Sequence, residues 1–90
     1  KLGTEQPEYI PDFVAETESA IFMVETKARG DMNTQEVQAK AAVAARWCEY
    51  ASDHAREVGT KSWKYLLIPH DEVTESKRLS DYMRFEKKTA

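Results

Sequence analysis

The chain has 90 residues, a length that fits a single domain with one modest hydrophobic core. Net charge is -3, with 32% charged and 41% hydrophobic residues, and no apolar run approaches the ~18 residues that span a bilayer. The single cysteine, Cys48, excludes an internal disulfide, and neither Cys/His zinc spacing nor a secretory signal is present. This composition favours a reducing, cytoplasmic setting, and its acidity argues against a stand-alone DNA-binding module.

Two strands joined by a tight connection are expected first. The segments Tyr9 to Thr17 and Ala20 to Ala28 are rich in aromatic and β-branched residues, which favours an antiparallel hairpin. Only Glu18 and Ser19 separate them. Because Glu-Ser suits a two-residue primed turn poorly, we favour a four-residue loop from Thr17 to Ala20, although both connections give the same register.

A long helix follows the hairpin. Asn33 or Thr34 is a good N-cap, and Gly59 is a natural C-cap. An alanine-rich apolar stripe with alternating steps of four and three residues indicates the face that packs on a sheet. The stripe comprises Val37, Ala41, Ala44, Cys48, Ala51, Ala55 and Val58.

The remaining elements are a buried strand and a last helix. Trp63 to Ile68 is almost continuously apolar, as in a strand that is covered on both faces, and Pro69 ends it. Asp71 is expected to cap a helix that runs to about Phe85, with apolar residues available for packing at Val73, Leu79, Met83 and Phe85. The order β-β-α-β-α predicts an α/β fold with a mixed sheet flanked by helices, in which the second and third strands are parallel.

The hairpin register brings ionisable side chains together. If Thr17 pairs with Ala20, opposite positions sum to 37, so Asp12 lies across from Glu25. Opposed Cβ atoms in such a pair are roughly 4.5–5.5 Å apart, and alternation along the strand puts Lys27 on the face of Glu25.

Two acidic side chains directly opposite each other need compensation. Mg²⁺, or Mn²⁺ in its place, would provide it, with ligands from Asp12, Glu25 and the backbone carbonyl of Thr26. A bound metal of this kind activates water and shields charge on phosphate, and Lys27 would orient the attacking water. In the simpler alternative, the carboxylates are solvated strand-end residues and Lys27 is an ion-pair partner.

The pattern Pro11-Asp12, twelve residues, then Glu25-Thr26-Lys27 resembles the signature of PD-(D/E)xK nucleases. The stretch EYIPDFVAETESAIFMVETKARGD is similar to the C-terminal endonuclease region of type III restriction enzymes and related helicase-like restriction proteins, and the likeness continues through AKAAVAARWCEYA and WKYLLIPHDEV. The resemblance implies a restriction-endonuclease-like fold, with Asp12 and Glu25 as acidic metal ligands and Lys27 as the catalytic lysine.

The same resemblance implies a Mg²⁺-dependent endonuclease domain, residues 1–90, that cuts double-stranded DNA in a bacterial restriction system. An ATP-driven helicase or translocase domain would lie upstream, since this chain has no GxxxxGK[ST] loop. The chain begins with Lys1, and only eight residues precede Tyr9, too few for the first helix and strand of the family core. We therefore expect a C-terminal piece of a longer protein, with a sheet edge exposed for self-association.

Lys40 is a further candidate for the site. It lies on the shoulder of the helical stripe, and some nucleases of this superfamily place a helix-borne Gln or Lys beside the metal. The ordinary alternative is a surface lysine packed on Trp47. Two other functions remain open for the whole domain: a non-catalytic nucleic-acid-binding or assembly module with a nuclease-like fold, and a repair or junction nuclease.

Overall fold

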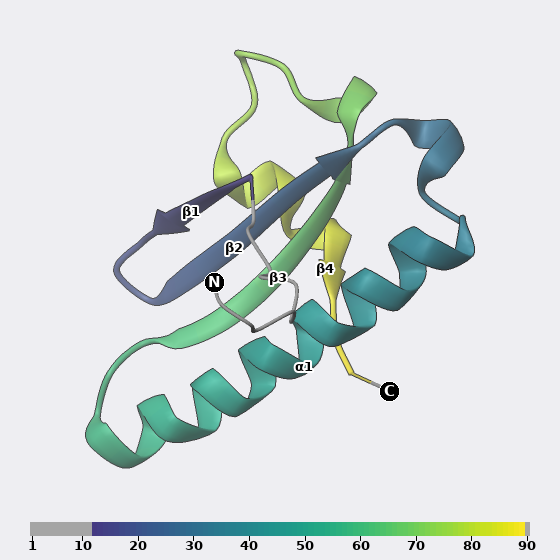
Figure 1. Cartoon of the computed structure of the whole chain (residues 1–90). Coiled ribbons are helices and arrows are strands. Elements are labelled where there is room, and N and C mark those ends of the chain that lie inside the picture. Colours follow the sequence, from purple (N-terminus) through teal and green to yellow (C-terminus); the bar gives the residue numbers. More distant parts are fainter. Residues whose placement is uncertain (1–11, 90) are drawn as a thin grey trace, which may run out of the picture.

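A four-stranded mixed sheet forms the centre of the computed structural model, which describes residues 12–89 (Figure 1). The strands, in spatial order, are β1 Phe13–Glu16, β2 Ala20–Lys27, β3 Ser62–Pro69 and β4 Glu86–Lys87. The two central strands, β2 and β3, are parallel, and each outer strand is antiparallel to its neighbour. The predicted α/β class and the parallel crossover are therefore confirmed.

The hairpin has the register that the sequence predicts. Phe13 pairs with Val24, so opposite positions sum to 37. The Thr17 amide donates to the Ala20 carbonyl at 2.8 Å, and the Thr17 hydroxyl accepts the Ala20 amide at 3.1 Å, which closes the four-residue loop. The first strand was predicted from residue 9; residues 9–11 lie outside the described part, and β1 begins at Phe13.

The helix α1, Gln35–Val58, covers one face of the sheet (Figure 1). Thr34 is its N-cap, with the hydroxyl accepting the Val37 amide at 3.3 Å. Gly59 ends the helix in the left-handed conformation at φ 78°, where glycine has no Cβ penalty. Within residues 12–89, no helix is both long and apolar enough to cross a membrane. Most of the predicted stripe does face the sheet, and Ala41, Ala44 and Cys48 pack with Met23, Tyr65 and Leu67. Val58, its last residue, is 57% exposed at the end of the helix, so the stripe does not extend that far.

The opposite face is covered by a segment that the sequence analysis assigned wrongly. The predicted helix from Asp71 to Phe85 is instead two short 3-10 helices, η2 His70–Glu72 and η3 Leu79–Phe85, joined by an irregular loop. Partly buried apolar residues of this segment pack against the buried residues of the sheet face. The resulting layer contains Phe22, Val24, Leu66, Ile68 and Tyr82, with Leu79, Met83 and Phe85 packed against it.

Side-chain hydrogen bonds explain why this segment is not one helix. The Asp81 carboxylate accepts the Arg78 amide at 2.8 Å, and the Tyr82 hydroxyl accepts the Thr74 amide at 3.2 Å. Such bonds offer the backbone an alternative to helical pairing. Val73, predicted to pack, is 49% exposed, so that expectation is also wrong.

Candidate functional site

The carboxyl end of β2 carries the predicted catalytic residues. Met23 is buried against α1, and side chains alternate along a strand, so Glu25 and Lys27 also lie on the α1 face. Both are half-buried. The parallel strand β3 ends beside them, since Lys27 pairs with Pro69. The two side chains therefore lie at an edge where the sheet and the start of α1 meet.

Asp12 is held at this edge by Thr26. Extending the hairpin register by one step puts Asp12 opposite Glu25, but its Oδ2 accepts the Thr26 amide at 2.8 Å and the Thr26 hydroxyl at 3.1 Å. The Asp12 carboxylate thus accepts, beyond the end of β1, a backbone hydrogen bond that a carbonyl of a neighbouring strand would ordinarily accept. Because a strand residue directs its N–H and C=O toward the same neighbour, the Thr26 carbonyl also faces the β1 side.

Glu25 is held by a residue of β3, the strand that the sequence predicts to be buried on both faces. The hydroxyl of Tyr65, whose side chain is 1% exposed, donates to Glu25 Oε1 at 2.6 Å. Tyr65 lies in β3 opposite Met23, and this parallel register fixes the contact. Nothing in the sequence set the register between β2 and β3, which is why the role of Tyr65 was missed.

Lys27 and Lys40 line the same hollow. It has a volume of about 280 Å³ and lies between the end of β2 and the first turns of α1. Its lining residues are Lys27, Asp31, Thr34, Glu36, Val37 and Lys40. Lys40 pairs with Glu36, one helical turn earlier, at 3.4 Å. The structure brings the two predicted lysines to one place and adds two acidic residues, Asp31 and Glu36, that the motif did not indicate.

The donor set for a metal is small. Among residues 12–89, no group of three or more His, Cys, Asp and Glu side chains converges. The predicted ligands, two carboxylates and a backbone carbonyl, are oxygen atoms of the kind that Mg²⁺ prefers with several waters and substrate oxygens. Their chemistry fits the ion, and the hydrogen bonds from Thr26 and Tyr65 would orient the carboxylates as partners of metal ligands commonly do.

Beyond this edge, an ion-pair network connects the loop after β2 with the segment after β3. Arg29 donates to both carboxylate oxygens of Asp71, at 2.8 and 2.9 Å, and to Glu72 at 3.0 Å. Lys77 and Arg84 also reach Glu72, at 2.8 and 3.1 Å. The hydrogen bond from Arg29 lowers the pKa of Asp71, and that from Lys77, with the surrounding cations, lowers the pKa of Glu72. The loop after β2 is thereby tied to the segment after β3.

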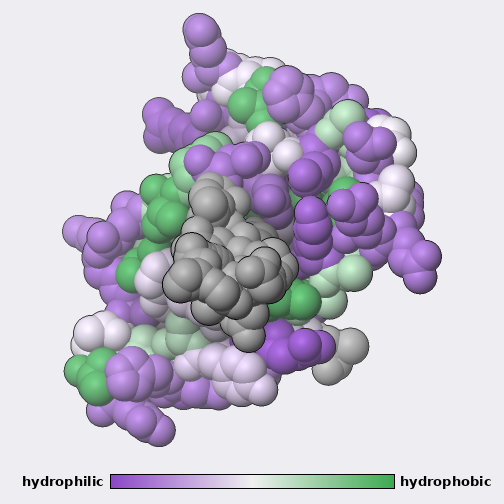
Figure 2. Space-filling view, viewed as in Figure 1, coloured by the Kyte–Doolittle hydropathy of each residue, from purple (hydrophilic) through white to green (hydrophobic). Residues whose placement is uncertain are grey.

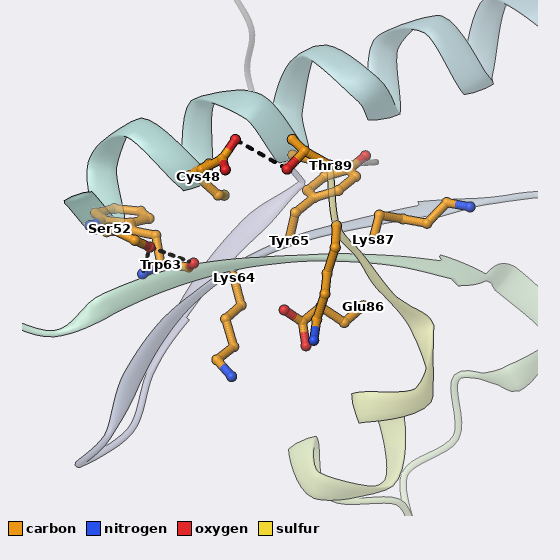
Figure 3. A pocket seen from close by; sticks show the side chains of 11 residues that line it. Cys48, Ser52, Trp63, Lys64, Tyr65, Glu86, Lys87 and Thr89 are labelled. Atoms are coloured by element: carbon orange, nitrogen blue, oxygen red, sulfur yellow. Dashed lines mark hydrogen bonds between the residues drawn. The ribbon is translucent and has the colours of Figure 1, made fainter.

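A second hollow, of about 290 Å³, lies between α1, β3 and β4 (Figure 3). Cys48, Trp63 and Tyr65 are among its lining residues, and Thr89 donates to Glu49 across it at 3.1 Å. Burial, with the nearby charge of Glu86, raises the pKa of the Cys48 thiol to about 11. The thiol is therefore protonated at neutral pH and a poor nucleophile, as expected of a core cysteine.

No family model, curated protein or solved structure matches the chain.

Proposed function

We propose that this chain carries the active site of a Mg²⁺-dependent endodeoxyribonuclease of the PD-(D/E)xK type. The observation that supports the proposal best is the hairpin register, which puts Asp12 beside the Glu25-Thr26-Lys27 strand end. The shared hollow of Lys27 and Lys40 adds two cationic groups at the same edge. The order hairpin, helix, parallel strand also agrees with a restriction-endonuclease-like core.

Each residue has a distinct role in this proposal. Asp12, Glu25 and the Thr26 carbonyl would hold Mg²⁺, which supplies a water of lowered pKa and neutralises charge on the scissile phosphate. Lys27 orients the attacking water and donates to a non-bridging phosphate oxygen as negative charge develops. Lys40 lies across the hollow from Lys27 and binds the neighbouring phosphate. Thr26 and Tyr65 keep the carboxylates in place.

The setting of the enzyme is part of the proposal. The substrate is double-stranded DNA, and the domain belongs to a bacterial restriction system in the cytoplasm, as the sequence resemblance implies. Net charge is -3, so binding by this chain alone is weak at physiological salt. An ATP-driven helicase or translocase domain of the parent protein would hold the DNA.

Metal binding and cleavage test the proposal together. Titration calorimetry with Mg²⁺ and Mn²⁺ is measured for the 90-residue chain and for Asp12→Ala and Glu25→Ala. We expect each substitution to weaken metal binding at least about tenfold, as loss of a metal partner does. Glu75→Ala is the matched control, an exposed carboxylate in the loop between η2 and η3, and should bind like the parent.

Plasmid nicking provides the second measurement. Lys27→Ala should reduce Mn²⁺-supported cleavage about 100-fold or more with metal binding retained, while the exposed Lys88→Ala is the control. Unchanged metal affinity in both carboxylate variants would overturn the site. Preferred cleavage of branched over linear DNA would assign the same site to a junction or repair nuclease.

A non-catalytic assembly or nucleic-acid-binding module is the second candidate. The hydrogen bonds from Thr26 to Asp12 and from Tyr65 to Glu25 favour it, because they also satisfy the two carboxylates in a purely structural role. In that case Asp12→Asn should leave DNA binding unchanged and lower only the free energy of unfolding. Metal-independent DNA binding by the parent chain would support this candidate.

A further inference from the structure

Three large apolar side chains lie exposed on the outer flank of α1. Val43 is 55% exposed, Trp47 47% and Tyr50 67%. Their steps of four and three residues put them on one side of the helix. Each precedes by one position a residue of the stripe that faces the sheet, so they form a second stripe beside the first. Exposed apolar side chains that are neighbours on one flank of a helix are typical of an interaction surface.

The pattern continues with polar residues at both ends. Lys40 precedes Val43 by three residues, while His54 and Glu57 follow Tyr50 at steps of four and three. We call these six residues the Trp47 stripe: Lys40, Val43, Trp47, Tyr50, His54 and Glu57. Alternating three- and four-residue steps are the spacing of a seam between two packed helices. The 24 residues of α1 give a helix about 36 Å long, at 1.5 Å per residue, which is enough for such a seam.

Two copies of the Trp47 stripe have complementary charges only when the two helices run antiparallel. Its amino end carries Lys40 and its carboxyl end Glu57, both exposed. If two copies of α1 pair antiparallel around a two-fold axis near Cys48, opposite positions sum to 97. Lys40 then faces Glu57 of the second copy, and Trp47 faces Tyr50 of the second copy. A parallel pair would set each charge against its equal, which is unfavourable.

We propose that a second copy of this chain binds the Trp47 stripe, so that two α1 helices pair antiparallel across a two-fold axis. Such an isologous interface uses the same patch twice. Trp47 is already held edge-on against Trp63, with ring centroids 5.0 Å apart, so little side-chain entropy is lost when it is covered. This surface differs from the sheet edge at β1, where hydrophobic surface also gathers over the hairpin (Figure 2).

Sedimentation equilibrium of the 90-residue chain tests the pairing. We expect a reversible monomer–dimer equilibrium, and Tyr50→Asp should raise the dimer dissociation constant at least about tenfold, since a charge would replace a central aromatic contact. Val73→Asp is the matched control, because Val73 is similarly exposed but lies off the helix. Circular dichroism of each variant confirms that the fold is retained.

A charge exchange tests the direction of the helices. Lys40→Glu and Glu57→Lys should each weaken the dimer, and the double variant should restore it, a pattern that misfolding would not produce. A chain that stays monomeric to millimolar concentration would overturn the proposal. So would a dimer that tolerates Tyr50→Asp, which would indicate pairing at the β1 edge, or a double variant that stays weak. The readout is molecular mass, so it is independent of metal and DNA.

Discussion

The two faces of the sheet are covered in different ways. On one face, α1 packs through alanines and Cys48 onto Met23, Tyr65 and Leu67. On the other, the 3-10 segment packs through larger side chains, Tyr82 among them, onto Leu66 and its neighbours. A regular helix with small residues can approach a sheet closely along its whole length. An irregular segment has no continuous face, so it needs large side chains and specific polar bonds to cover the same area.

The polar bonds differ in the same way. The α1 face is fixed mainly by packing, and Ser52 links the helix to β3 by donating to the Trp63 carbonyl and accepting the Trp63 amide, at 2.9 and 2.8 Å. The 3-10 face depends on Glu72, whose carboxylate accepts from three cationic side chains. We therefore expect the first face to be sensitive to volume and the second to be sensitive to charge.

Adjacent leucines of β3 provide the largest test. Leu66 and Leu67 are 0% and 1% exposed and point to opposite faces. Each change to alanine should lower the free energy of unfolding by about 2–5 kcal/mol. Leu67→Ala should cost more, because the short alanine side chains of α1 cannot move into the cavity. Urea denaturation of both variants measures the difference. An equal loss in the two variants, or a larger loss in Leu66→Ala, would contradict the proposed difference between the two faces.

A larger side chain in the interface tests how closely α1 approaches the sheet. Ala44 is 1% exposed and faces the sheet, so Ala44→Leu should force the helix outward and cost about 1–3 kcal/mol. Ala42 is exposed on the same helix, and Ala42→Leu is the control. Thermal unfolding followed by circular dichroism measures both. If Ala44→Leu proves neutral, a gap must remain between α1 and the sheet.

The smallest expected effect concerns the ion pairs of the face that the 3-10 segment covers. The pKa values of Asp71 and Glu72 are lowered in the folded state, so their ion pairs contribute stability that is fully present above the ordinary values of 3.8 and 4.5. That stability is lost as the pH falls through the lowered folded values. The network is exposed, so the effect should be small and screened by salt.

Glu72→Gln is the variant for this measurement. It should flatten the decline of the melting temperature as the pH falls below 4.5, while Glu75→Gln, which changes an exposed carboxylate of the same segment, leaves the decline intact. An unchanged pH profile in Glu72→Gln would show that Glu72 does not hold the 3-10 segment.

The sequence predicted those features that depend on local periodicity and loops. The hairpin register followed from the loop at Thr17, and the bounds of α1 followed from Thr34 and Gly59. The segment after β3 was predicted wrongly as a helix, because its shape depends on bonds made by Asp81 and Tyr82 that no periodicity reveals.

For the candidate site, too, the sequence predicted the features that depend on local spacing and missed the contact that depends on distant strands. Glu25 and Lys27 share a face because alternation along one strand is local. Lys40 was chosen as a shoulder residue of the helix, and it does line the hollow of Lys27. The contact between Tyr65 and Glu25 depends on how two strands far apart in the chain align, which the sequence did not specify. Metal binding and catalysis stay predictions.

That contact has a consequence for how the site assembles. Tyr65 reaches Glu25 only when β2 and β3 pair in the observed register. A slip of one residue would turn Tyr65 to the opposite face, where its hydroxyl could not reach the carboxylate. The hydrogen bond between Tyr65 and Glu25 and the correct pairing of the two central strands are therefore acquired in one step, and a misaligned chain would lack both.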